Sequence, residues 1–171
     1  MVVESRVHLI CGSTGAGKTT YAKALSARIG AVHFSIDQWM ARLYWPDAAM
    51  PIDPAWAMER VERCTAQILT MAKQVALAGT PVVLDLGFST REQRSRAADD
   101  ARAAGLAAKL HFVDVSAEER WRRAQAREST PADEHRLPFA IDRAMFDYVE
   151  SIFQPPDAAE MAALNGVRVT G

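Results

Sequence analysis

The sequence predicts an α/β fold: a three-layer α/β/α sandwich with a five-stranded parallel sheet in the middle layer. Two observations predict it. Short apolar segments alternate with longer segments of helical periodicity along the chain. A glycine-rich turn also joins the first apolar segment to the first helical one. No internal repeat or change in composition divides the 171 residues, so we expect one domain over residues 1–171.

Composition and charge exclude several classes of protein. The formal net charge is −1 at pH 7, which argues against bulk nucleic acid or an anionic membrane as a partner. No apolar run reaches the length of a membrane span and no signal peptide precedes the first strand, so we expect a soluble, cytoplasmic protein. Cys11 and Cys64 show no metal-ligand spacing and are expected to be buried apolar residues. No pattern specifies an oligomeric state.

The turn between the first strand, predicted over residues 6–11, and the first helix, predicted over residues 18–29, carries the motif G-x-x-x-x-G-K-S/T. Glycine lets the backbone curl around a phosphate with its N–H groups inward, and the start of the helix adds its dipole. Lys18 can then reach the β- and γ-phosphates of a triphosphate, and the Thr19 hydroxyl can bind Mg²⁺. The alternative is a glycine-rich turn that binds nothing. The predicted phosphate-binding residues are Gly12, Ser13, Thr14, Gly15, Ala16, Gly17, Lys18, Thr19 and Thr20.

The second strand, predicted over residues 31–35, is followed directly by a carboxylate, Asp37. Ligands of open parallel sheets bind at the carboxyl ends of the strands, which makes Asp37 a candidate for the active site. The alternative is that Ser35 or Asp37 only caps the helix that follows.

Residues 38–53 are predicted to be less regular, and they contain Trp39 and Trp45, with Trp56 just beyond. Two interpretations stay open: the flat rings stack on a ring-bearing acceptor, or they belong to ordinary core packing. A long helix over residues 54–78 follows, with a proline at its first position.

The third strand ends in a second carboxylate. Residues 81–86 are almost wholly apolar, as in strands that are buried on both faces, and Asp85 stands near the end of this run. An uncompensated buried carboxylate is costly, and proteins with this phosphate loop carry an acid here that helps to hold Mg²⁺. We therefore predict that Asp85 belongs to a magnesium site.

The next helix is predicted over residues 89–104, with a capping box formed by Ser89 and Glu92. Its first turns carry Arg91 and Arg94, which are candidates for contact with substrate because this end of the helix faces the edge of the sheet where ligands bind.

Three arginines share one face of the following helix. A strand over residues 110–115 leads into a capping box at Ser116, and the helix then carries Arg120, Arg123 and Arg127 at i, i+3 and i+7. The alternative is that these arginines are simply solvated, since Glu119 and Arg123 form an i, i+4 pair that needs no ligand. The remaining predicted elements are a polar loop over 129–136, helices over 139–153 and 158–164, and a strand over 167–169.

With these residues in place, the chain resembles the small P-loop kinases of the AAA-domain group, which includes zeta-toxin-like and chloramphenicol-phosphotransferase-like proteins and the kinase domain of polynucleotide kinases. The phosphate loop is the most specific part of the resemblance, which extends from residues 7–12 to residues 153–156 and Glu160. It implies a P-loop nucleoside triphosphate hydrolase fold of the kinase type, ATP and Mg²⁺ as cofactors, and a lid region at about residues 116–137.

The resemblance also implies roles for individual residues. Asp37 matches the aspartate that activates the acceptor hydroxyl, and Asp85 matches the one that helps to hold Mg²⁺ together with Thr19. Arg123 and Arg127 match lid arginines that clamp the transferred phosphoryl group, with Arg120 as a further candidate.

We therefore expect the chain to transfer the γ-phosphoryl group of ATP to a hydroxyl of a small-molecule or nucleotide-like acceptor. Acceptor-nucleotide signatures of nucleoside monophosphate kinases are missing, and the apolar residues after Asp85 make a nucleic-acid acceptor less favoured. Two alternatives stay open: a polynucleotide 5′-hydroxyl kinase, and a nucleotide-dependent switch or ATPase that has no acceptor. A membrane partner is not expected.

Overall fold

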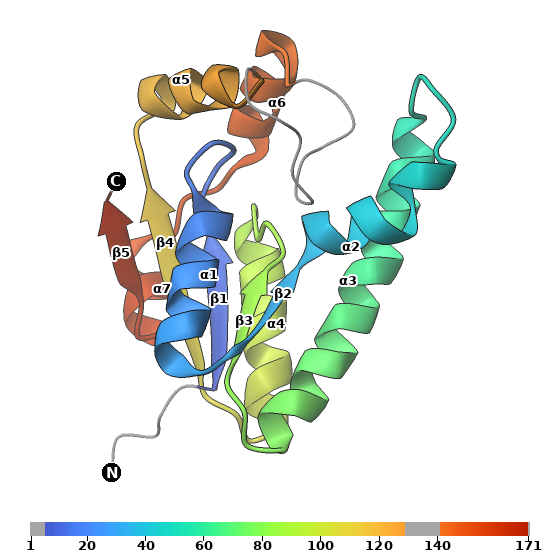
Figure 1. Cartoon of the computed structure of the whole chain (residues 1–171). Coiled ribbons are helices and arrows are strands. Elements are labelled where there is room, and N and C mark those ends of the chain that lie inside the picture. Colours follow the sequence, from blue (N-terminus) through green and yellow to red (C-terminus); the bar gives the residue numbers. More distant parts are fainter. Residues whose placement is uncertain (1–5, 129–140, 171) are drawn as a thin grey trace.

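Five parallel strands form one sheet in the computed structural model, which describes residues 6–128 and 141–170 (Figure 1). The sheet order is β2-β3-β1-β4-β5, so β1 lies in the middle, between β3 and β4. Because all the pairs are parallel, every carboxyl end lies at the same edge of the sheet. The strands are β1 (Val7–Cys11), β2 (Val32–Ser35), β3 (Val82–Asp85), β4 (Ala108–Asp114) and β5 (Val167–Thr170).

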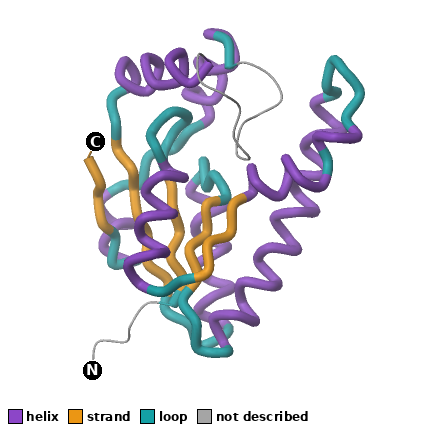
Figure 2. Tube along the Cα trace, in the orientation of Figure 1, coloured by secondary structure: helices purple, strands orange, loops and turns teal. Residues whose placement is uncertain are grey.

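Helices cover both faces of the sheet, which confirms the predicted three-layer α/β/α sandwich (Figure 2). Helix α1 packs on one face, α3 and α4 pack on the other, and α5 and α6 lie beyond the carboxyl edge (Figure 1). The helices are α1 (Lys18–Ile29), α2 (Ile36–Leu43), α3 (Pro54–Leu77), α4 (Arg91–Ala103), α5 (Ala117–Glu128), α6 (Arg143–Ile152) and α7 (Ala158–Ala163), with a short 3-10 helix at Trp45–Asp47.

The alternation of side chains along β1 explains why its sequence is apolar throughout. Leu9 and Cys11 face α3 and α4, whereas Ile10 faces α1, and all three are fully buried. Cys11 and Cys64 are both free and buried, as predicted. Within residues 6–128 and 141–170, no helix combines the length and the apolar character needed to cross a membrane.

Helix α2 includes the first residues of the segment that was predicted to be irregular. The Ser35 hydroxyl caps it by accepting a 3.4 Å hydrogen bond from the Gln38 amide, and Ile36 and Met40 form its buried face. The prediction of an irregular start to residues 38–53 was therefore wrong. The rings of this segment serve core packing, because Trp39 and Trp45 lie against the hydrophobic core.

The N-cap of helix α4 lies one residue later than predicted, and the helix begins at Arg91. Thr90, not Ser89, is its N-cap: its hydroxyl accepts a 3.2 Å hydrogen bond from the Gln93 amide, and the Gln93 side chain accepts one of 3.1 Å from the Thr90 amide. Glu92 is thereby left out of the capping box. The reciprocal pair is Thr-x-x-Gln, which satisfies the same two amides as the predicted Ser-x-x-Glu would.

The two arginines of the first turns of α4 hold this helix to the C-terminal segment. The Arg94 side chain is completely buried and forms hydrogen bonds of 2.5 and 2.9 Å to the two carboxylate oxygens of Glu160. Arg91 pairs with Asp157 at 2.9 Å. A guanidinium that makes two parallel bonds to a carboxylate is held in a fixed orientation. These contacts give Arg94 a structural role, because its guanidinium is buried against Glu160. The Arg91 side chain is exposed, and its contact with substrate stays a hypothesis.

Candidate active site

The phosphate loop leaves β1 in a conformation that requires glycine. Gly12, Gly15 and Gly17 have φ angles of 153°, 79° and 89°. A Cβ atom at Gly12 would lie 2.6 Å from the Val113 carbonyl oxygen, and one at Gly15 would lie 2.4 Å from the Arg120 carbonyl oxygen. The loop therefore packs directly against β4 and α5, with no room for a side chain at these two positions.

The nine predicted phosphate-binding residues are contiguous, from the end of β1 to the first turn of α1. Gly17 is the N-cap of α1 and supplies no side-chain cap, so no side chain competes with an anion at this cap. The Lys18 ammonium donates a 3.1 Å hydrogen bond to the Ser13 carbonyl, back across the loop. Burial lowers the pKa of Lys18, and the negative charges of Asp85 and Asp37 oppose that shift.

The structure brings Thr19 and Asp85 together at the carboxyl edge of the sheet. The Thr19 hydroxyl donates a 2.7 Å hydrogen bond to Oδ2 of Asp85, whose side chain is only 5% exposed. Burial raises the pKa of Asp85, but neighbouring His33, the Thr19 hydroxyl and the Lys18 charge outweigh that effect and hold the pKa below its usual value. Asp85 is thus ionised despite its burial.

The donor set formed by Thr19 and Asp85 fits Mg²⁺. This cation prefers oxygen ligands, usually takes one or two from the protein, and completes its octahedron with waters and substrate phosphates. Among the described residues no group of three or more His, Cys, Asp or Glu side chains is arranged to hold a metal ion. The pair therefore suits a cation that phosphate oxygens also bind. It suits less well a cation whose ligands all come from the protein.

His33, in β2, also belongs to the site, although its sequence position predicts only a place in a strand. Its Nε2 atom lies 3.6 Å from Oδ2 of Asp85, which is too long for an ordinary hydrogen bond. This nitrogen is buried and has no hydrogen-bond partner among the residues that the structure describes. The pairing of β2 with β3 brings His33 next to Asp85.

Asp37 lies in the first turn of α2, at the same sheet edge, and is exposed. The register of β2 and β3 pairs Ser35 with Asp85, so the start of α2 adjoins the end of β3. The N-cap of α2 is Ser35, so Asp37 does not cap this helix. Asp37 is also close enough to Lys18 for its charge to raise the pKa of the ammonium.

The three arginines of α5 differ in their surroundings. The Arg120 side chain is buried, and it donates hydrogen bonds of 2.8 Å to the Val115 carbonyl and 3.3 Å to the Thr14 carbonyl in the phosphate loop. Arg123 is half-buried beside the loop, with its NH1 atom 3.9 Å from the position of a Cβ at Gly17. The side chain of Arg127 lies outside the described residues, as does the part of the predicted lid over residues 129–137.

A carboxylate from α6 also reaches the phosphate loop. Oε2 of Glu150 accepts a 3.1 Å hydrogen bond from the Ser13 hydroxyl and lies 2.6 Å from NH1 of Arg120. The hydrogen bond from Arg120 lowers the pKa of Glu150 despite some burial. Nothing in the sequence near Glu150 marks this contact, because its two residues are 137 positions apart.

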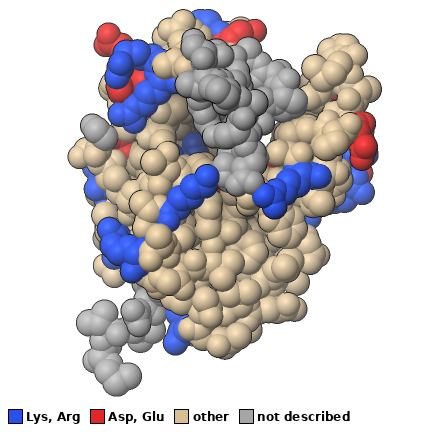
Figure 3. Space-filling view, viewed as in Figure 1, with Lys and Arg blue, Asp and Glu red and all other residues tan. Residues whose placement is uncertain are grey.

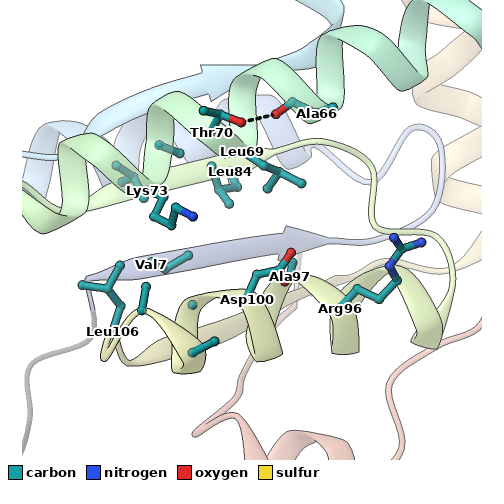
Figure 4. A pocket seen from close by; sticks show the side chains of 15 residues that line it. Val7, Ala66, Leu69, Thr70, Lys73, Leu84, Arg96, Ala97, Asp100 and Leu106 are labelled. Carbon is teal, nitrogen blue, oxygen red and sulfur yellow. Dashed lines mark hydrogen bonds between the residues drawn. The ribbon is translucent and has the colours of Figure 1, made fainter.

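A groove of about 500 Å³ lies between α3 and α4, on the face of the sheet opposite α1 (Figure 4). Its apolar lining includes Leu69, Leu84 and Leu106, and its charged lining residues are Lys73 from α3 and Arg96 and Asp100 from α4. None of the predicted phosphate-binding residues lines this groove. It is therefore separate from the site at the carboxyl edge.

Lys and Arg side chains do not form one continuous basic surface on the face seen in Figure 3. Those of the described residues lie in several separate places, with uncharged surface between them.

Comparison with solved structures identifies the fold. Kti12 of Chaetomium thermophilum, solved in complex with ADP-AlF3, has a TM-score of 0.71 and 16% identity over 96% of this chain and 88% of its own. A sugar kinase from a Janibacter species has a TM-score of 0.67 and 14% identity over 97% and 85%. The APS kinase CysC of Mycobacterium tuberculosis, solved in complex with AMPPNP and APS, has a TM-score of 0.62 and 19% identity over 98% and 89%. At these identities the likeness shows the fold, which is the predicted P-loop kinase fold.

No curated protein matches this chain. The family model of the AAA domain does match it, over residues 7–156, from the start of β1 to the segment between α6 and α7. This match covers most of the sequence and includes the whole phosphate loop together with Asp37 and Asp85. The chain therefore belongs to the AAA-domain family.

Proposed function

We propose that the protein is a kinase that uses ATP and Mg²⁺ to phosphorylate a hydroxyl of a small-molecule or nucleotide-like acceptor. The observation that carries this proposal is the hydrogen bond between Thr19 and Asp85 at the end of the phosphate loop, with Lys18 and Asp37 beside it. The kinases among the similar structures support it. Phosphoryl transfer needs positioning and charge neutralisation more than covalent chemistry from the protein, and these residues supply both.

The phosphate loop and Lys18 bind the triphosphate in this proposal. The glycines let the main chain approach the phosphates closely, and the start of α1 faces the same negative charge. Lys18 leaves the Ser13 carbonyl and pairs with the β- and γ-phosphate oxygens, which are stronger acceptors than a neutral carbonyl.

Thr19 and Asp85 would hold Mg²⁺ against the phosphates. The ion would supply neutralisation of the charge on the transferred group and the leaving ADP. Asp85 is suited to this because it stays ionised, and its hydrogen bond to Thr19 already holds both oxygens near each other.

Asp37 orients the acceptor in this proposal. Its carboxylate accepts a hydrogen bond from the acceptor hydroxyl and takes the proton as the oxygen bonds to the γ-phosphorus and the bond to ADP breaks. Arg123 and Arg127 would neutralise the phosphoryl oxygens from the α5 side. The place of Arg123 beside Gly17 supports its part in this clamp.

The experiment that tests the proposal measures ADP release from ATP and Mg²⁺ against a panel of hydroxyl-bearing compounds. The panel holds aminoglycosides, phenicols, nucleosides, UDP-sugars and 5′-hydroxyl oligonucleotides, and Lys18→Ala gives the background. We expect one small-molecule class to accelerate ADP release, and Asp37→Asn to abolish that acceleration while ADP binding persists. Asp47→Asn, at another exposed aspartate of the α2–α3 connection, is the matched control.

Two results would overturn the proposed acceptor. Acceleration by oligonucleotides alone, with strong dependence on salt, would indicate a polynucleotide 5′-hydroxyl kinase. Slow ATP hydrolysis that no compound accelerates would indicate a nucleotide-dependent switch.

A further inference from the structure

One carboxylate oxygen, Oε2 of Glu150, connects two segments of the candidate nucleotide site. It accepts the hydrogen bond from Ser13 in the phosphate loop at 3.1 Å and contacts NH1 of Arg120 in α5 at 2.6 Å. Glu150 itself belongs to α6, a third segment. Ser13 is buried, whereas the Glu150 side chain is 39% exposed, so the hydrogen bond joins a buried hydroxyl to a carboxylate at the protein surface.

Arg120 makes further contacts with the same loop. Its guanidinium donates to the Thr14 carbonyl at 3.3 Å, and its own carbonyl oxygen occupies the space next to Gly15. Three consecutive loop residues, 13 to 15, are therefore in contact with Glu150 or Arg120. Lys18 also contacts this part of the loop, by its hydrogen bond from α1 to the Ser13 carbonyl.

The burial of Arg120 makes this arrangement depend on Glu150. The Arg120 side chain is 6% exposed, and its guanidinium lies 5.5 Å from the centre of the Phe146 ring, one turn before Glu150 on α6. A buried guanidinium without a carboxylate partner is costly, so loss of Glu150 would favour movement of Arg120 towards water. The loop would then lose its contacts at Ser13 and Thr14 together.

We propose that Glu150 is a positioning residue for nucleotide binding, acting through Ser13 and Arg120 to hold the phosphate loop in its binding conformation. This inference rests on the proposed function only in that the loop binds a nucleotide. A loop that is already ordered loses less conformational entropy when the ligand binds. Glu150 therefore increases affinity for nucleotide without touching it.

The test is calorimetric titration of Mg·ADP into the full chain and its variants. We expect Glu150→Ala to weaken ADP binding about tenfold, Glu150→Gln to weaken it less because an amide oxygen still accepts from Ser13, and Ser13→Ala to weaken it a few-fold. The double variant Ser13→Ala with Glu150→Ala should bind no more weakly than Glu150→Ala alone, because both changes remove the same contact. Asp147→Asn breaks an exposed ion pair with Arg143 on the same helix and should leave ADP affinity within about twofold.

A second readout separates positioning from general stability. Hydrogen exchange of the amides of residues 13–17 in the nucleotide-free protein should speed up in Glu150→Gln, which is mild enough to fold, and should stay unchanged in Asp147→Asn. Unchanged ADP affinity in Glu150→Ala, or additive losses in the double variant, would overturn the positioning role. If the wild-type chain bound no ADP, the proposed function itself would be wrong and this role would fall with it.

Discussion

The Thr19 hydroxyl donates a 2.7 Å hydrogen bond to Asp85, which connects the first turn of α1 to the end of β3. A hydroxyl that donates in one direction keeps its oxygen lone pairs for another partner. The bond therefore leaves the lone pairs of the Thr19 oxygen free for a cation that is bound to nucleotide phosphates. Asp85 would share that cation with Thr19.

Asp85→Asn should raise the Mg²⁺ concentration needed for ADP binding or turnover. The amide can still accept from Thr19, but it removes the negative charge, so we expect the apparent Mg²⁺ affinity to fall about tenfold or more. Titration of Mg²⁺ at fixed ADP measures this. Asp114→Asn, at the end of β4, is the control because that carboxylate pairs with Arg168 of β5 and not with Thr19. An unchanged Mg²⁺ requirement in Asp85→Asn would remove Asp85 from the metal site.

Lys18→Ala should abolish ADP binding at concentrations that saturate the wild-type chain, since the loop loses its only side-chain cation within the motif. Isothermal titration measures the loss. Lys23→Ala removes an exposed lysine from the same helix and should bind normally. Equal affinity in the two variants would contradict the assignment of the loop.

Gly15→Ala should disrupt the phosphate loop far more than a similar change elsewhere. Its Cβ would lie 2.4 Å from the Arg120 carbonyl oxygen, and its φ is 79°. Gly105 has a φ of 73° but no atom within 4 Å of an added Cβ, so Gly105→Ala carries only the left-handed strain of about 1–2 kcal/mol. We expect ADP binding to be lost in Gly15→Ala and kept in Gly105→Ala. Equal binding by both would show that the loop has room at Gly15.

Arg94→Met should destabilise the fold by about 3–5 kcal/mol, because it leaves the Glu160 carboxylate buried without its partner. Urea unfolding measures the change. The exposed pair between Arg102 and Asp99 is the control, and Arg102→Ala should cost about 0.5 kcal/mol or less. A small effect of Arg94→Met would mean that Glu160 is protonated or hydrated in the variant.

The stability of the protein should fall as the pH drops below about 6.5. Burial, together with the charges of His8, Lys109 and Arg28, lowers the pKa of His111 from an ordinary value of 6.5 to about 4. Between these pH values the unfolded chain binds more protons than the native one, so up to about 3 kcal/mol of stability is lost as the pH falls from 6.5 to 4. Urea unfolding of wild type and His111→Gln at several pH values checks this; the variant should lose less. Identical pH dependence in the two proteins would contradict it.

Local signals predicted most of the fold. The phosphate loop and the alternation of apolar runs with helical segments depend on residues within a few positions of each other, and α1 was predicted with its observed bounds. Helix α2 was not predicted, because its buried face consists of only Ile36 and Met40 and the residues after it include tryptophans and prolines. The capping box of α4 was misplaced by one residue because Ser89 and Glu92 satisfy the same pattern as Thr90 and Gln93.

The candidate site was predictable only where one motif defines it. Thr19 and Asp85 followed from the loop and from a carboxylate at the end of a buried strand. His33 depends on β2 lying next to β3, and the order of the strands is not visible in the sequence. Glu150 and Glu160 carry contacts over 137 and 66 positions, and no local spacing marks either one.

Strand β2 ends at Ser35 and α2 begins at Ile36, with no linker between them. The main chain at Asp37 is thereby anchored to the sheet, whereas the 3-10 helix at Trp45–Asp47 lies beyond the far end of α2. Substitutions in the connection over residues 46–53 should therefore leave the backbone beneath the proposed base in its place.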